Sequence, residues 1–382
     1  MSNIGENVHP KSQIVVPRTT FLSYRNAMET ILCDISAFEF LRIPPCVLRL
    51  SLDTPDLSTS RDRQSLHRHD RFLGYVRVPL HILECNRAHM HQSTAFIRHL
   101  WTGDLPSGSL VEIDAYHSVT SPELTLLLLA RHLPLPQLAL AMYELTGTYS
   151  EIHLTAEHRN ELKRRMSQAG WRGEDGWRPV IDVRGNITDQ WYREPLTTKE
   201  NLERFARAVG NVRGIRRFRQ AIDLLCGVAG SSFEAKSAIT IGWERYLGGW
   251  GLGQMLLNYN VPFDAGARTI AGQSYARVDL FLEATDSLPA LGIECQGRSV
   301  HGASGITEHD ADRLLALEST GLPVILVTYQ QIENQKRFQE LIQLIAKKRG
   351  AKLRPKTPRQ AAKEKELRYQ VLHAWNQLWH QP

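Results

Sequence analysis

Two apolar segments, each interrupted by one acid, lie close together in the second half of the chain. Residues 275–284 read YARVDLFLEA and residues 291–295 read LGIEC. The short link between them is rich in residues that favour turns. This pattern predicts two neighbouring strands joined as a hairpin, with Asp279 in the first strand and Glu294 in the second.

The two acids suggest a metal site. Side chains alternate between the faces of a strand, so Glu294 and Gln296 should point the same way, and the hairpin could bring Asp279 beside them. Converging carboxylates repel each other unless a hard cation lies between them, and Mg²⁺ or Mn²⁺ suits oxygen ligands of this kind. The alternative is structural, with Asp279 in an ion pair with Arg277 or Arg313.

The segments around the hairpin predict a complete α/β unit. Ser231 to Glu234 forms an S-x-x-E capping pattern before an apolar helix, and residues 256–263 predict the first strand of a sheet. Residues 308–320 predict a helix that presents Asp310 and Arg313 on one face. A further apolar strand is expected at 323–328.

This order of motifs, over about residues 231–332, resembles the very-short-patch-repair-like branch of the PD-(D/E)XK nucleases. The resemblance implies an α/β nuclease core, with a mixed sheet flanked by helices, that hydrolyses DNA phosphodiester bonds with Mg²⁺ or Mn²⁺. Its motifs map onto seven positions in order: Glu234, Asp279, Glu294, Gln296, His301, Asp310 and Arg313.

The resemblance also implies a role for each position. Asp279 and Glu294 would hold the metal, and Gln296 would orient the attacking water. Glu234 would hold a second water or a second metal, His301 would act as general acid or base, and Asp310 and Arg313 would support the site.

One departure from the family pattern sets up the competing hypothesis. The residue at the usual Lys position is Gln296, which carries no charge to stabilise the transition state. Either His301 or Arg313 compensates, or the fold is catalytically inactive and acts as a DNA-binding regulator or antitoxin-like protein. A plain interaction protein is the third hypothesis.

The N-terminal half predicts a different, α+β unit. We expect a helix at 23–41, a long loop at 48–71, and strands at 75–84, 95–101 and 110–119. Ser121, followed by Pro122 and Glu123, predicts a helix start, and a second helix should end at Gly147. The strands followed by V-x-S-P-E and an apolar helix resemble AbiEi-type antitoxin and regulator proteins.

The connecting region is basic. We expect a helix at 156–168, a loop at 169–191 and a helix from the Thr197–Glu200 capping box to Val209. The next helix carries four arginines that suit a phosphate clamp on DNA, with a solvated helix face as the alternative. These arginines are Arg213, Arg216, Arg217 and Arg219.

Four regions follow from these patterns. They are a regulator-like domain at 1–150, a basic helical connector at 151–230, a nuclease-like domain at 231–346, and a basic linker with a C-terminal helix at 347–382. An apolar stripe including Leu367, Val371 and Trp375 should dock that last helix on the body.

Composition and charge agree with an anionic partner. The chain has 382 residues, a net charge of +6 and a pI near 9.1, which favours nucleic acid. Its five scattered cysteines form no C-x-x-C pair, and its H-x-H pairs at 67–69 and 89–91 lack a spaced acid or cysteine. No apolar segment resembles a signal peptide or membrane span, so we expect a cytoplasmic protein, either a monomer or a homodimer.

Overall fold

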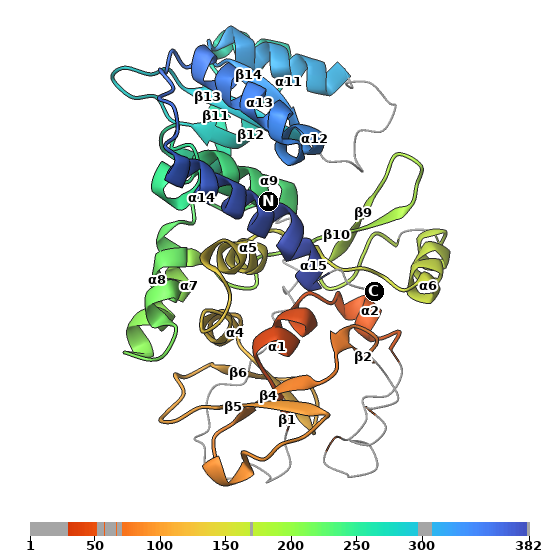
Figure 1. Cartoon of the computed structure of the whole chain (residues 1–382). Helices are drawn as coiled ribbons and strands as arrows, with labels where there is room; N and C mark the ends of the chain where they lie inside the picture. Colours follow the sequence, from red (N-terminus) through yellow and green to blue (C-terminus); the bar gives the residue numbers. More distant parts are fainter. Residues whose placement is uncertain are drawn as a thin grey trace, which may run out of the picture.

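The computed structural model describes residues 30–51, 57, 66, 71–168, 171–296 and 308–379, with the backbone alone at 308–310 and 379. Within these residues the chain is mixed α/β, with helices packed on sheets that contain both parallel and antiparallel neighbours. Figure 1 shows the N-terminal sheet and the C-terminal sheet at opposite ends of the molecule, with a helical layer between them.

The N-terminal sheet has five strands in the order β5-β4-β1-β7-β6. Helix α1 covers it, and α2, the short hairpin β2–β3 and the 3₁₀ turn η1 lie beside it. The elements are β1 (Thr30–Leu32), α1 (Asp34–Leu41), α2 (Pro45–Leu48), β2 (Arg71–Phe72), β3 (Val76–Arg77), β4 (Leu80–Glu84), η1 (Arg87–His89), β5 (Phe96–Leu100), β6 (Leu110–Glu112) and β7 (His117–Thr120).

The helix expected at 23–41 is wrong in its central part, and residues 23–29 lie outside the described residues. Thr30–Leu32 forms a strand because it pairs on both sides, with Leu32 opposite Ile82 of β4 and Val119 of β7. Sheet hydrogen bonding on both edges therefore overrides the helical pattern, and the helix begins only at Asp34.

The helical layer begins where the sequence indicates. Ser121 caps α4 (Pro122–Leu129) by accepting the Leu124 amide at 3.3 Å, and α5 (Leu135–Thr146) ends at Gly147. Two further helices, α7 (Lys199–Ala208) and α8 (Ile215–Asp223), pack against this pair. The N-cap of α7 is Thr198, one residue after the predicted Thr197.

A three-stranded sheet, β8-β10-β9, projects from the helical layer. It consists of β8 (Tyr149–Glu151), β9 (Arg178–Ile181) and β10 (Ile187–Tyr192), with the predicted basic helix α6 (Ala156–Met166) at its side. The loop expected at 169–191 is therefore wrong. Asp182 nucleates a hairpin turn by accepting the Arg184 and Asn186 amides at 2.9 and 2.7 Å, and Gly185 supplies the positive φ of 77°.

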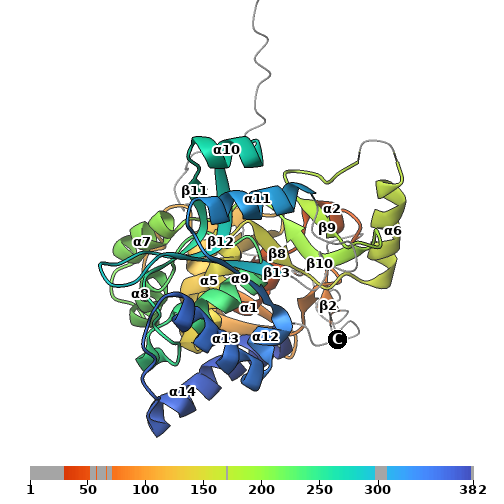
Figure 2. The same cartoon turned by 90° about the horizontal axis from the view of Figure 1, so that it is seen from above.

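The C-terminal sheet has the order β11-β12-β13-β14, with β13 and β14 parallel and the other pairs antiparallel. Helix α9, the π-helical turn η2 and α13 pack on one face, and α10 and α11 cover the other (Figure 2). The elements are α9 (Ser232–Ser237), η2 (Ala238–Gly242), the 3₁₀ turn η3 (Arg245–Leu247), β11 (Met255–Pro262), α10 (Ala265–Ala271), β12 (Tyr275–Leu282), β13 (Leu291–Gln296), α11 (Glu308–Ser319), β14 (Val324–Thr328), α12 (Tyr329–Glu333) and α13 (Gln335–Lys348).

The C-terminal segment docks on the body as its apolar stripe predicts. It forms α14 (Pro358–Tyr369), the π-helical turn η4 (Gln370–Ala374) and α15 (Trp375–Trp379). Leu367, Val371 and Trp375 are buried in the same core as α5 and the C-terminal sheet. The domain boundaries at 150, 230 and 346 stay predictions.

Candidate functional site

A cleft of about 790 Å³ lies between the three-stranded sheet and the C-terminal sheet. Residues of β9 and β10 line one side, and residues of α9, β11, β12 and β13 line the other. Three acidic residues line it: Glu194, which follows β10, Glu234 from α9 and Asp279 from β12. The predicted acid of the S-x-x-E motif and the predicted acid of the first hairpin strand therefore meet in one cavity.

Glu234 is held rigidly at the start of α9. Ser231 caps this helix, and its hydroxyl donates to Glu234 Oε1 at 2.9 Å. Glu234 Oε2 accepts from the Gly230 amide at 2.7 Å and from Asn258 Nδ2 at 2.6 Å. Burial raises the pKa of Glu234, and these hydrogen bonds oppose the rise.

The pKa of Asp279 is raised in the same direction. Its Oδ2 accepts the Cys295 amide of the neighbouring strand at 2.7 Å. Burial, followed by the negative charge of Glu234, raises its pKa from 3.8 to about 6, against the opposing effects of the Cys295 amide, Arg313 and Arg277. Each of these carboxylates therefore disfavours ionisation of its neighbour, which is the environment that a bound cation relieves.

Glu294 has a different environment. Both of its carboxylate oxygens accept from Arg313 of α11, at 3.0 and 3.2 Å, and Arg313 also donates to the Arg277 carbonyl at 3.0 Å. Because side chains alternate along β13, Cys295 faces the cleft with Asp279, and Glu294 faces the helix on the other side. The structure does not bring Glu294 into the cleft with Asp279.

The remaining predicted site residues have separate outcomes. Gln296 is half-buried at the end of β13, on the same side of the strand as Glu294, as the alternation predicts. His301 lies outside the described residues. Asp310 lies in α11, where the backbone alone is described. Arg313 is half-buried, and its partner is Glu294.

Sequence reasoning missed the basic side of the cleft. Arg172, Arg178 and Arg277 are exposed and line it, and Tyr192 of β10 lies among them with 42% of its surface exposed. Arg178 and Tyr192 belong to the hairpin that the sequence suggested was a loop. The buried positions Val180, Ile187 and Trp191, on either side of the turn at Asp182–Gly185, were the signal that could have identified it.

Two of the four arginines proposed to clamp phosphate have structural partners. Arg217 donates to the carbonyls of Ala130 and Leu133, beyond the end of α4, at 3.1 and 2.9 Å. Arg219 donates to the Ala206 carbonyl of α7 at 2.9 Å. These bonds satisfy carbonyls near helix ends. Arg213 and Arg216 are exposed beside the turn that precedes α8.

Comparison with known proteins gives no relative for this chain: no family model, no curated protein and no solved structure matches it. In the part of the chain that the structure describes, none of the helices has the length and apolar character needed to span a bilayer. The site must therefore be interpreted from its own chemistry.

Proposed function

We propose that the chain is a metal-dependent nuclease that hydrolyses DNA phosphodiester bonds in the cleft between β9–β10 and the C-terminal sheet. The single observation that carries the proposal is the pairing of Glu234 and Asp279 in a cavity lined by exposed arginines. The element order α9-β11-α10-β12-β13-α11-β14 around a mixed sheet also agrees with the PD-(D/E)XK resemblance.

The donor set of the cleft fits Mg²⁺ or Mn²⁺. Carboxylate oxygens are the ligands these ions prefer, and both acids have raised pKa values that a cation would lower. For Asp279, the Cys295 amide occupies Oδ2, and no donor to Oδ1 is seen among the described residues. A bound ion would supply an activated water and neutralise charge on the scissile phosphate.

The side chains of the chain have distinct tasks in this proposal. Asp279 and Glu234 bind the metal, and Asn258, Ser231 and the Gly230 amide fix the orientation of Glu234.

The exposed arginines of the cleft serve the substrate. Arg172, Arg178 and Arg277 attract the phosphate backbone and hold it beside the acids. Tyr192 offers a ring face to an unpaired base. The ion pair between Glu294 and Arg313 joins β13 to α11 and so holds the strand that lines the cleft in position.

A cleavage assay tests the proposal. Wild type and Asp279→Ala would be incubated with supercoiled plasmid and with single-stranded DNA, in Mg²⁺, in Mn²⁺ and in EDTA. Cutting that requires metal and disappears in the variant supports the nuclease. Metal-dependent cutting that persists in Asp279→Ala would refute the assignment of this cleft.

A DNA-binding protein without catalysis is the second candidate. Two features favour it. The uncharged Gln296 stands where the family resemblance expects a lysine, and Glu294, where it expects a metal-binding acid, is paired with Arg313. DNA binding with a steep salt dependence and no cutting in any metal would favour this candidate.

A further inference from the structure

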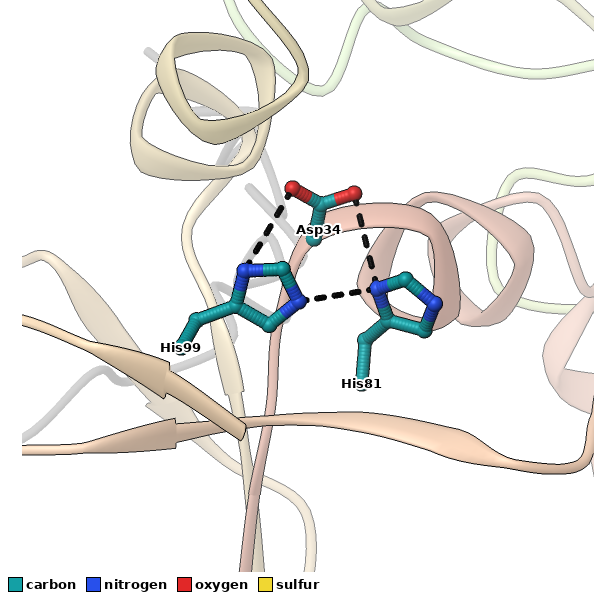
Figure 3. A group of neighbouring side chains, drawn as sticks. All are labelled: Asp34, His81 and His99. Atoms are coloured by element: carbon teal, nitrogen blue, oxygen red, sulfur yellow. Dashed lines mark hydrogen bonds and ion pairs between the residues drawn. The ribbon is translucent and has the colours of Figure 1, made fainter. Parts of the chain in front are cut away.

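A second group of chemically reactive side chains lies in the N-terminal sheet, at the other end of the molecule from the cleft (Figure 1). Asp34 begins α1, His81 lies in β4 and His99 lies in β5. Figure 3 shows the carboxylate of Asp34 facing both imidazole rings, with the two rings also in contact with each other. Three elements that are distant in sequence thus supply three metal-ligating groups.

The distances within the group suit a small ion. His81 Nδ1 lies 3.7 Å from Asp34 Oδ1, and His99 Nδ1 lies 4.0 Å from Asp34 Oδ2. The two rings are stacked, with His99 Nε2 2.9 Å from His81 Nδ1. One atom from each residue can be chosen so that all three lie within 4.8 Å of one another. A tetrahedral Zn²⁺ sets its ligand atoms about 3.3 Å apart, so the three groups would draw together around the ion.

The carboxylate is buried and only half satisfied. Asp34 is fully buried, and its Oδ1 accepts the Ile35 amide and His132 Nε2, both at 2.8 Å. Among the described residues, its buried Oδ2 has no hydrogen-bond partner. An unpaired buried carboxylate oxygen is costly, and a cation at this point would remove that cost.

The protonation states favour ligation. Burial lowers the pKa of His81 to about 4 and also lowers the pKa of His99, with the charge of Asp34 opposing both changes. Burial raises the pKa of Asp34, but the hydrogen bond and charge of His132, followed by the charges of His99 and His81, outweigh it and lower that pKa. Near neutral pH the group therefore offers neutral imidazoles and an ionised carboxylate, which are the forms that bind metals.

One neighbouring group opposes a cation. Arg131 is close enough for its charge to lower the pKa of His99, and it lies over the Trp101 ring at 5.4 Å. Its positive charge should weaken metal binding without touching the ion. This gives the site a residue whose removal should tighten binding.

We propose that Asp34, His81 and His99 form a binding site for one divalent transition-metal ion of the Zn²⁺ class, with water as the fourth ligand. His132 is a positioning residue, because its bond to Oδ1 directs Oδ2 towards the rings. The bound ion ties the β1–α1 junction to β4 and β5. This site is independent of the proposed nuclease cleft.

A Co²⁺ titration tests the site. The full chain, without a histidine tag, would carry Asp279→Asn to remove the cleft's metal site, and would be stripped with EDTA before titration. The expected result is one equivalent of Co²⁺ with the visible absorption of tetrahedral coordination, displaced by Zn²⁺. Absence of saturable Co²⁺ binding in this protein would overturn the proposal.

Single substitutions in the same background locate the ion. His81→Ala and His99→Ala should lose saturable binding, and His132→Ala should weaken it by about 10- to 100-fold. His153→Ala, at an exposed histidine paired with Asp189, should leave binding unchanged. Equal binding by His81→Ala and the parent would contradict the assignment.

A variant that should bind metal more tightly separates effects on the site from effects of misfolding, because misfolding cannot raise the affinity. Arg131→Gln should bind Co²⁺ about 10-fold more tightly, because it removes the opposing charge. Thermal unfolding in EDTA should show each variant folded like the parent, and Zn²⁺ should raise the melting temperature of the parent but not of His81→Ala. Unchanged or weaker binding by Arg131→Gln would count against the site.

Discussion

Asp279 and Glu294 occupy neighbouring strands of one sheet, yet their environments differ completely. Asp279 faces the cleft with Glu234, and its pKa is raised to about 6 by burial and by that second acid. Glu294 faces α11 and accepts two bonds from Arg313. An acid within an apolar strand can therefore be a candidate metal ligand or a member of an ion pair. The elements that pack on each face of the sheet determine which of the two roles it has.

The largest predicted difference between the two acids is in metal affinity. Asp279→Asn should weaken Mn²⁺ binding by at least about 100-fold, because a ligand and a charge are lost. Glu294→Gln should change it by less than about 3-fold. Calorimetric titration in a background lacking His81 measures both. Equal losses of Mn²⁺ affinity in the two variants would show that Asp279 and Glu294 do not differ as metal ligands.

The second prediction concerns stability. Arg313→Met removes the guanidinium that donates to both oxygens of the largely buried Glu294 carboxylate, which should lower the free energy of unfolding by about 3 kcal/mol. The double variant Arg313→Met/Glu294→Gln should recover most of that loss, as urea unfolding of the full cycle would reveal. Asp279→Asn should not destabilise the protein. If Arg313→Met is as stable as wild type, Glu294 is not held as described.

The third prediction is a pH dependence with an unusual sign. The pKa of Asp279 is higher in the folded state than its ordinary value of 3.8, so the folded state binds the proton more tightly. Protonation of Asp279 therefore stabilises the folded state. This stabilisation is fully present below pH 4 and is lost as the pH rises through about 6. Relative to Asp279→Asn, wild type should lose about 2 kcal/mol between pH 4 and pH 7, with solvent exposure of the group taken into account.

Metal should reverse this loss. Adding Mg²⁺ at pH 8 should stabilise wild type, because the cation binds the ionised carboxylates, and should leave Asp279→Asn unchanged. Thermal unfolding at pH 4, 6 and 8 measures both effects. A wild type that gains stability relative to Asp279→Asn across this pH range would contradict the raised pKa.

The smallest predicted effect belongs to the basic side of the cleft. Arg178→Gln should weaken DNA binding modestly and reduce the slope of log K against log salt by about 1. Arg207→Gln, at an exposed arginine of α7, is the matched control and should change neither. Fluorescence anisotropy over a range of salt concentrations distinguishes the two. If both variants have the same slope of log K against log salt, Arg178 does not contact DNA.

Local signals predicted much of the fold. The Ser121–Pro122 helix start, the strands that contain Asp279 and Glu294, and the docked stripe at Leu367 and Val371 are confirmed because each depends on short-range chemistry. The helix expected through Thr30 failed because strands distant in sequence pair with that segment. Long-range pairing cannot be read from a local pattern.

The candidate site could be predicted only in part for the same reason. Glu234 and Asp279 were identified from motif order, and the cleft brings them together. The pairing of Glu294 with Arg313 depends on the face that α11 covers, which sequence spacing does not specify. The group at Asp34 was missed because its members lie on three separate elements without a local motif.

The measurement that tests the central claim most directly is the single-turnover rate of DNA cleavage by Glu234→Gln and Glu294→Gln, compared in saturating Mg²⁺. The account predicts that Glu234→Gln loses about 1,000-fold or more, since a metal ligand contributes several kcal/mol to the barrier, and that Glu294→Gln stays within about 10-fold of wild type. A severe loss in Glu294→Gln, with Glu234→Gln still active, would contradict it.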